Sequence, residues 1–384
     1  MALIVHLQWR NSLEYACRCQ LSSQDFCFIY KIGIILYRIF RQLLSSGPDE
    51  AIIRIILLHH WIFVTTSVRP KRVLAICYTQ TGQLARIATQ ILAPLQENPD
   101  VEVHLEVLRP LLVYPFPWPF FQFFDAFPEA AHLIAPKLEP LALTGDEDFD
   151  LVILFYQVWF LAPSLPVTAF LQHPLAAKLL KDKPVVTVIA CRNMWMMAHQ
   201  KMKSMLANLG ARLIDNVVLS DRGNVFTTFI TTPRWFLTGK QTGFLGCPPA
   251  GIAPDEILRA RRFGLAIQAA LAADAEKREA PLLAGLKAVE ANPKLYFSEQ
   301  AGTRSFYLWG KLLRAAGEPG QWSRKPILFF YVIFLAILIV TVVPVSLALQ
   351  TLIRPLLRKK LARMKHDFEL PSGSGTERMT DYVI

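Results

Sequence analysis

The sequence lacks the cysteine pattern of a disulfide-stabilised or zinc-binding domain. Its six cysteines are scattered over 384 residues, too few and too far apart for a disulfide framework. Cys17, Cys19 and Cys27 lie close together, but no histidine or fourth thiol stands beside them at zinc-finger spacing. We therefore expect no metal site. The sparse cysteines are typical of a protein that faces a reducing, cytoplasmic compartment.

Signatures of nucleic-acid binding are also missing, although the formal net charge is +11. The chain has no zinc-finger spacing, no aromatic RNA-binding signature and no arginine-rich arm. Its basic residues gather instead directly after an apolar segment, at Arg354, Arg358, Lys359, Lys360, Arg363 and Lys365. Basic side chains at such a place meet anionic lipid headgroups. We expect these basic residues to contact membrane lipid and not nucleic acid.

Charge is absent from residues 327–353, a long apolar run. About 20 such residues suffice to cross a bilayer as a helix. We expect a transmembrane helix here or, if Pro344 breaks it, a re-entrant or interfacial element. Basic residues flank the run on both sides, so the positive-inside rule does not determine the orientation of the run in the membrane. Residues 354–384 are expected to form a basic, flexible tail.

Residues 1–70 lack both a spanning-length apolar run and a signal-peptide cleavage site. Their short apolar runs are interrupted by Lys or Arg. A basic amphipathic helix on a membrane, around residues 34–44, is one interpretation. The other is that these residues are poorly ordered, or that they belong to an upstream start codon and not to the functional protein.

From residue 71 to residue 275, short β-rich apolar runs alternate with helix-period segments. This alternation predicts an α/β domain with a doubly wound parallel sheet and helices on both faces. Five strands are expected, at residues 73–77, 101–107, 151–155, 185–190 and 213–219. The aromatic and proline-rich run 114–128 and residues 231–252 do not fit the alternation and are interpreted as insertions. Residues 276–326 are expected to link this domain to the apolar segment.

A hydroxyl-rich loop, "YTQTGQ" at residues 78–83, follows the first predicted strand. Ligands of an open parallel sheet bind at the carboxyl ends of its strands, where the strand order reverses. The loop lacks the lysine of a triphosphate-binding loop and the three glycines of a dinucleotide fingerprint. Thr79 and Thr81, the Gln83 amide and the close approach allowed by Gly82 suit a monophosphate held without metal. Ordinary capping of the next helix is the alternative.

Two further predicted strand ends carry aromatic and polar residues. Tyr156, Trp159 and Phe160 follow the third strand, and a Cys-Arg-Asn sequence follows the fourth. Together they would enclose a flat heterocycle whose phosphate lies in the first loop, which is the shape of an FMN site. The expected FMN-binding residues are Thr79, Gln80, Thr81, Gly82, Gln83, Tyr156, Gln157, Trp159, Cys191, Arg192 and Asn193.

Four sequence blocks resemble a known family. "ICYTQTGQ" is similar to the phosphate loop of flavodoxin-like proteins. "YPFPWPFFQFFDAFPE", "FDLVILFYQVWFLAPSLPVTAFL" and "VVTVIACRNMWMMAHQK" resemble, in this order, the dialkylresorcinol condensing enzyme family, flavodoxin-like proteins encoded with aryl-lipid pathways. The resemblance implies a flavodoxin-like, FMN-dependent oxidoreductase. This enzyme would oxidise a dialkyl cyclohexanedione, made by a partner ketosynthase, to the aromatic resorcinol.

The family label says "condensing", but the domain has no obvious thiol nucleophile. Cys191 is interpreted as a small apolar residue at a strand end rather than an activated thiolate. In the oxidation the flavin accepts a hydride while a base removes a proton. Tyr156 and His199 are the candidate bases, and Arg192 or Asn193 would donate to the diketone oxygen. A flavin wall for Tyr156 and a solvated helix position for His199 are the structural alternatives.

The sequence is compatible with more than one role for its aromatic run and more than one function. The aromatic run 114–128 either covers the flavin and alkyl chains, enters the membrane interface or packs in the core. An NAD(P)H:quinone oxidoreductase, with NAD(P)H as a second cofactor, is a rival function, as is a membrane-bound electron-transfer or scaffold protein. We expect an apolar substrate with alkyl chains and a domain on the cytoplasmic side of the inner membrane. A homodimer is left open.

Overall fold

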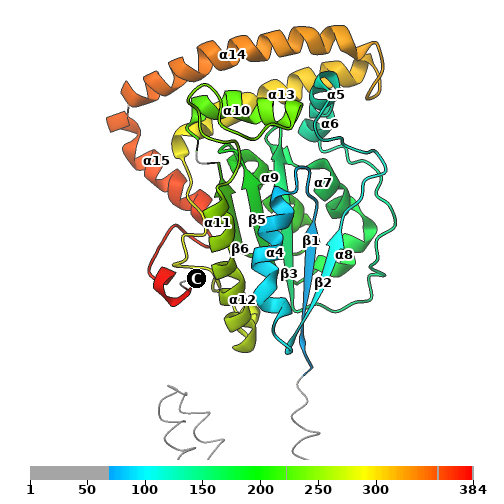
Figure 1. Ribbon diagram of the computed structural model, residues 1–384, viewed down its shortest axis with the longest axis vertical. Helices are drawn as coiled ribbons and strands as arrows, with labels where there is room; N and C mark the ends of the chain where they lie inside the picture. The colour runs from blue at the N-terminus through cyan, green and yellow to red at the C-terminus, as the bar shows by residue number, and fades with distance from the viewer. Residues whose placement is uncertain (1–68, 222, 353, 383–384) are drawn as a thin grey trace, which may run out of the picture. The chain divides into compact units, whose positions relative to one another are not determined.

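The protein is described by a computed structural model for residues 69–382 except 222 and 353 (Figure 1). The predicted N-terminal extension, 1–70, lies outside the described residues save for its last two. The elements described here all belong to a unit that begins at Pro70.

Five parallel strands form the central sheet. They are β1 (Lys71–Cys77), β2 (Val101–Val107), β3 (Leu151–Trp159), β5 (Pro184–Cys191) and β6 (Arg212–Ser220). Their spatial order is β2-β1-β3-β5-β6, and the two-residue β4 (Ala162–Pro163) pairs antiparallel with β3 alone. When only the parallel strands are counted, this is the 2-1-3-4-5 order of the flavodoxin-like doubly wound fold. The predicted fold class and all five predicted strands are confirmed, and the third strand runs four residues further than expected.

Helices cover both faces of the sheet (Figure 1). One face carries α4 (Gln83–Gln96), α11 (Pro254–Arg259) and α12 (Arg261–Ala272), and the other carries α7 (Leu165–Gln172), α8 (Pro174–Leu180) and α9 (Met196–Asn208). Because parallel strands are buried on both faces, they are almost continuously apolar. Residues 151–156 of β3, for example, are all buried. The predicted apolar face of α4, which includes Leu84, Ile87 and Ile91, packs into this core.

A third layer covers the carboxyl ends of the strands (Figure 1). It consists of α5 (Phe120–Asp125), α6 (Phe127–His132), α10 (Val225–Thr238), α13 (Tyr296–Ala316) and α14 (Arg324–Leu352), and we call it the roof. Phe127, Leu313, Leu328 and Tyr331 form a small apolar core of its own. The aromatic run interpreted as an insertion supplies α5 and the start of α6. The second such stretch supplies the second half of α10 and the loop after it.

The long apolar helix is present, as expected, and Pro344 lies within it without ending it. Its segment Arg324–Thr341 is the one stretch among the described residues that is long and apolar enough to cross a membrane, judged by length and composition alone.

Residues 276–326 and 354–384, predicted as a linker and a flexible tail, are folded onto the sheet domain as far as the structure describes them. Leu282, Leu283 and Leu286 are buried in the main core. The short 3-10 turns η1 (Ala275–Lys277), η2 (Pro293–Leu295) and η3 (Met379–Tyr382) and the helix α15 (Arg354–Glu369) complete these regions. Beyond α15, Ser372 Oγ accepts a hydrogen bond from the Asn216 N–H (2.7 Å) and donates to Asp215 Oδ1 (2.7 Å), both on β6.

Candidate functional site

The strand order reverses at β1, which has β2 on one side and β3 on the other. Ligands of doubly wound sheets bind at this switch point. The loop 78–82 leaves β1 there, and Gly82 caps α4 with φ +77°, in the left-handed region that favours glycine. A side chain added at Gly82 would meet no atom within 4 Å, so the backbone is open on that side. The free N–H groups of the first turn of α4 are suited to an anion.

The register of the sheet brings three loops to the same level. Cys77 pairs with Phe155, and Gln157 pairs with Ala190. Thr79, Gln157 and Asn193 therefore lie at the ends of three neighbouring strands, which are about 4.8 Å apart in a sheet.

Each of these three residues has a buried oxygen without a protein partner. Among the residues that the structure describes, no hydrogen bond reaches Thr79 Oγ1, Gln157 Oε1 or Asn193 Oδ1. The Asn193 amide nitrogen, in contrast, donates to Thr228 Oγ1 (3.3 Å). Buried polar atoms are nearly always hydrogen-bonded, so three unpaired oxygens at one edge indicate a place for a polar ligand.

The two glutamines of the loop hold it in place. Gln80 Nε2 donates to the carbonyl oxygens of Tyr114 (2.9 Å) and Pro115 (2.7 Å). The Gln83 amide donates to the Ile252 carbonyl (3.2 Å) and accepts from the Ile252 N–H (3.1 Å). Both side chains are thus committed to neighbouring loops. Thr79, Thr81 and the backbone at Gly82 supply the other donors of this loop, and Thr81 Oγ1 also accepts a hydrogen bond from the Gln83 N–H (3.5 Å).

Aromatic rings surround Trp159 beside this loop. Its ring packs edge-on against Tyr78 (5.9 Å), Tyr114 (5.0 Å) and Trp118 (5.6 Å). The aromatic run therefore packs on the end of β3 beside the loop 78–82. Phe120 and Phe121 of the same run stay exposed, so the run combines an inner wall with an outer apolar surface.

The end of β5 is polar but crowded. The Arg192 guanidinium lies over the Phe229 ring at 4.0 Å, and Nη2 donates to Met194 Sδ (3.5 Å). Burial lowers the pKa of Arg192 to about 10, although Asp221 opposes this shift. Burial also raises the pKa of the Cys191 thiol. A raised thiol pKa disfavours the thiolate, so it supports the interpretation of Cys191 as a packing residue.

Tyr156 and His199, the candidate bases, lie side by side inside the protein. Tyr156 Oη and His199 Nδ1 are 3.5 Å apart. Both side chains are fully buried, so neither is open to a ligand that enters from solvent. Burial, with a contribution from Lys203, lowers the pKa of His199 to about 3, which keeps the imidazole neutral. Arg192 and Asn193, in contrast, remain partly accessible.

Glu299 is a buried acid near the site that the sequence did not point to. It projects from α13, and its Oε2 accepts a hydrogen bond from the Met197 N–H (2.8 Å) in the first turn of α9. Oε1 has no partner within the described part of the chain. Burial raises the pKa of Glu299 to about 8, against hydrogen bonds from residues 195–197 that lower it. The carboxyl also acts electrostatically on Arg192. The sequence did not identify Glu299 because it lies in residues 276–326, which were expected to be a linker, and belongs to no recognisable motif there.

Comparison with known proteins gives matches to solved structures only. No protein-family model and no curated protein matches the chain. A flavoprotein in complex with FMN from Lactobacillus acidophilus NCFM is 15% identical, with a TM-score of 0.32 over 39% of this chain and 93% of that chain. A flavodoxin from the domain Archaea is 9% identical, with a TM-score of 0.30 over 53% and 99%. Oxidised flavodoxin 1 from Bacillus cereus is 13% identical, with a TM-score of 0.29 over 51% and 95%. These scores are too low to inform on ligand or activity, and the fold assignment rests on strand order and register.

Proposed function

We propose that this chain is an FMN-dependent oxidoreductase that converts a dialkyl cyclohexanedione to a dialkylresorcinol. The main support for an FMN cofactor is a set of three buried oxygens without hydrogen-bond partners at the switch point. They belong to Thr79, Gln157 and Asn193. When bound, FMN supplies the hydride acceptor for the oxidation. Thr79, Thr81 and the backbone at Gly82 would hold its phosphate, and Gln157 and Asn193 would meet polar atoms of its ring.

The residues around this edge suit an apolar diketone. Trp159 and its aromatic neighbours provide a wall for alkyl chains. The partly accessible Arg192 and Asn193 side chains offer donors for a carbonyl oxygen. Glu299 would act through the first turn of α9 and through Arg192, because its own carboxyl is fully buried. The resemblance to the dialkylresorcinol condensing enzyme family supports the substrate and a partner ketosynthase. The apolar segment 327–353 and a cofactor that is found in the cytoplasm support a place on the cytoplasmic side of the inner membrane.

Titration of the purified chain with FMN tests the cofactor. We expect flavin fluorescence to be quenched on binding. Thr79→Val, which removes the hydroxyl and keeps the shape, should weaken FMN binding roughly tenfold, as expected when a charge-assisted hydrogen bond is lost. Thr89→Val is the matched control, because Thr89 is an exposed threonine on α4 that bonds only its own helix. Absence of FMN binding, or equal binding by both variants, would refute the proposed site.

Anaerobic mixing of the FMN-loaded chain with a dialkyl cyclohexanedione tests the reaction. We expect the flavin to bleach and an equal amount of resorcinol to form. Bleaching by NAD(P)H alone, followed by quinone turnover, would replace this proposal with a quinone oxidoreductase. No bleaching by either donor would leave electron transfer or scaffolding as the role.

A further inference from the structure

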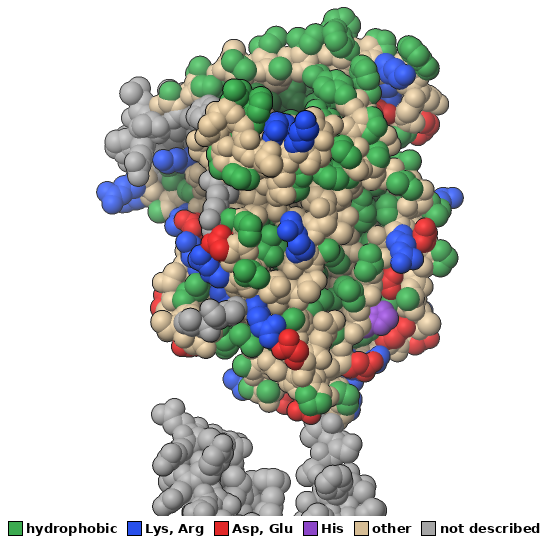
Figure 2. All heavy atoms as spheres, viewed as in Figure 1, with side chains coloured by type: hydrophobic (Ala, Val, Ile, Leu, Met, Phe, Trp, Pro, Cys, Tyr) green, Lys and Arg blue, Asp and Glu red, His purple; other side chains and the backbone are tan. Residues whose placement is uncertain are grey.

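The outer side of the roof is apolar. Figure 2 shows hydrophobic side chains gathered along the upper edge of the molecule, where Figure 1 places α14, α13 and α5. The exposed apolar side chains of these helices include Phe120, Phe121, Tyr307, Leu308, Leu312, Phe329, Phe330, Ile333, Ile337 and Val340. Phe330 is 65% exposed and Val340 is 72% exposed. Large exposed apolar patches on a folded protein mark a surface that is covered by a partner or a membrane.

The charges on the segments that carry this patch are mostly basic. Residues 300–366 contain a single acidic residue, Glu318, and eleven basic ones: Arg304, Lys311, Arg314, Arg324, Lys325, Arg354, Arg358, Lys359, Lys360, Arg363 and Lys365. On α13, the exposed Arg304, Lys311 and Arg314 are interleaved with Tyr307 and Leu308. A long basic side chain beside apolar ones can keep its aliphatic stem in the hydrocarbon region of a bilayer while its charge reaches the lipid headgroups. An anionic bilayer therefore matches both the apolar patch and its basic surroundings.

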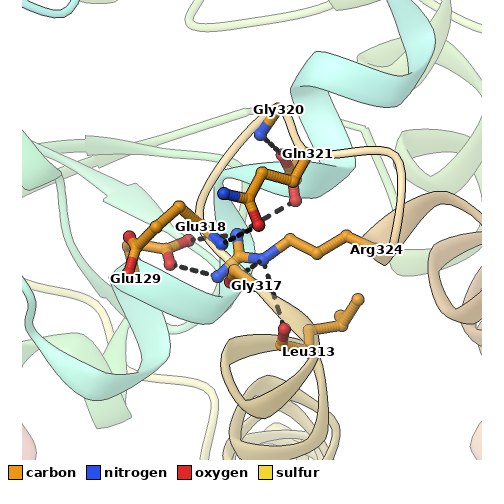
Figure 3. A network of polar contacts seen from close by, with 8 residues as sticks. Glu129, Leu313, Gly317, Glu318, Gly320, Gln321 and Arg324 are labelled. Atoms are coloured by element: carbon orange, nitrogen blue, oxygen red, sulfur yellow. Dashed lines mark hydrogen bonds and ion pairs between the residues drawn. The ribbon is translucent and has the colours of Figure 1, made fainter.

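The first turns of α14 are fastened to the folded unit (Figure 3). Arg324 is 1% exposed and pairs with Asp125 (Nη1 to Oδ1, 3.1 Å) and Glu129 (Nη2 to Oε1, 2.6 Å). Its Nε also donates to the Gly317 carbonyl (2.8 Å) at the end of α13. Further along, the buried Tyr331 ring packs on Phe127 (4.3 Å). The start of α14 is thereby held against α6 and α13.

The chain returns to the same unit after α14. Phe368, near the end of α15, packs on Tyr296 (5.7 Å), the first residue of α13. Phe334, in the first half of α14, packs on Trp309 (5.4 Å), in the second half of α13. Residues of α14 and α15 thus meet α13 in reverse order, and Figure 1 shows α14 running along α13. A helix of 29 residues is about 43 Å long, and this one lies along the roof instead of leaving it.

We propose that α14 lies in the plane of an anionic bilayer, with the outer side of the roof embedded in one leaflet, and that it does not cross the membrane. A crossing helix would place its two ends on opposite sides. Here Arg324, the first residue of α14, and Phe368, which follows α14 in the chain, both contact one folded unit. This inference does not depend on the proposed flavin chemistry, and its tests need no flavin.

Labelling of introduced cysteines tests the topology. Ser323→Cys and Lys359→Cys place thiols at exposed positions before and after α14, and the unmodified full chain gives the background from native thiols. Membranes of expressing cells are prepared as right-side-out and inside-out vesicles and treated with an impermeant maleimide. We expect both positions to be labelled in the same vesicle preparation. Labelling of one position in each preparation would show a crossing helix and overturn the proposal.

Binding to synthetic vesicles tests the surface. We expect the detergent-purified full chain to bind phosphatidylglycerol-containing vesicles at least roughly tenfold more strongly than phosphatidylcholine vesicles, because several basic side chains act together. Phe330→Glu combined with Ile337→Glu should weaken binding by roughly tenfold or more. Leu105→Glu combined with Leu258→Glu adds the same charge at exposed positions on β2 and α11 and should leave binding unchanged.

Circular dichroism and melting temperatures verify that both double variants remain folded. Equal vesicle binding by the two double variants would overturn the proposal. The proposal would also be overturned if the chain does not bind vesicles and instead forms a dimer that Phe330→Glu combined with Ile337→Glu dissociates. A second copy of the chain would then cover the roof.

Discussion

At the residue scale, the raised pKa of Glu299 predicts how the stability of the fold depends on pH. Its pKa is raised from an ordinary 4.5 to about 8, so the folded chain keeps a proton that the unfolded chain loses within this window. The free energy of unfolding should therefore fall as pH rises from about 4.5 to about 8. Glu299→Gln removes this dependence. The variant should resemble the parent near pH 5 and exceed its stability near pH 8, by about 4 kcal/mol at most. Denaturant unfolding across the pH series measures the difference.

Glu290→Gln is the matched control for this experiment. Glu290 is an exposed carboxyl that pairs with Lys287 (3.4 Å), so its substitution should change the free energy of unfolding only slightly. A gap between Glu299→Gln and the parent that stays constant from about pH 5 to pH 8 would contradict the raised pKa.

Several site residues could be predicted from the sequence because a strand end fixes its loop. Thr79, Gly82, Gln157 and Asn193 lie at the carboxyl edge as expected. The directions of side chains could not be predicted. Gln80 and Gln83 turn to the loops at Tyr114 and Ile252, contacts that depend on distant parts of the chain. Residues that belong to α13, such as Glu299, reach the site only through tertiary packing.

At the element scale, Arg324 fastens the α13–α14 hairpin to α6. Arg324→Met keeps much of the apolar volume but leaves the carboxylates of Asp125 and Glu129 without their partner. Breaking a buried ion pair in this way costs about 3–5 kcal/mol, so we expect a loss of this size in the free energy of unfolding. Arg314→Met, at an exposed position of α13, should cost less than about 0.5 kcal/mol. Equal effects of the two variants would show that Arg324 does not hold the hairpin.

The contact between α4 and α12 depends on a glycine. A Cβ at Gly264 would lie 2.0 Å from the Ile91 carbonyl oxygen, a backbone atom that cannot turn away. Gly264→Ala should therefore lose about 2 kcal/mol of stability or more, although alanine normally favours a helix by about 1 kcal/mol. Gly302→Ala in α13 is the control, because there a Cβ meets only the flexible end of Leu161, at 3.0 Å. Thermal unfolding should separate the two variants, and a Gly264→Ala variant as stable as Gly302→Ala would contradict the close packing.

The elements of the sheet and the elements of the roof differ in how well the sequence predicts them. The strands and α4 are predicted by hydrophobic periodicity, which can be recognised within a single segment of the sequence. The helices α5 and α6 lie in a proline-rich aromatic run, and each is six residues long, so no period of 3.6 can develop. Leu282, Leu283, Leu286, Ala288 and Val289 are buried without lying in a helix or strand. Their place in the core follows from what they pack against and not from their own pattern.

At the scale of the whole molecule, the sheet domain is completed by the chain that follows it. Asp215 on β6 accepts hydrogen bonds from the N–H groups of Leu282 (2.7 Å) and Leu283 (3.2 Å) and from Ser372 Oγ (2.7 Å). These contacts lie at the edge strand of the sheet. An uncovered edge strand exposes unpaired backbone groups and promotes association with other chains. The residues after 275 therefore cover the sheet edge and also supply α13 and α14 of the roof.

This arrangement predicts the behaviour of two fragments. Residues 70–384 form a unit with its own dense set of internal contacts, so this fragment should unfold cooperatively. Residues 70–275 match the domain that the sequence suggests, but they lack Leu282, Leu283 and Leu286, whose burial contributes roughly 2 kcal/mol each. The shorter fragment also leaves Asp215 without its three hydrogen-bond donors, and burial already raises the pKa of this carboxyl to about 6. We expect it to aggregate or to melt without a cooperative transition, as size-exclusion chromatography and calorimetry in detergent would show. A monomeric 70–275 fragment with a melting temperature equal to that of the longer one would instead make the sheet domain independent of everything that follows it.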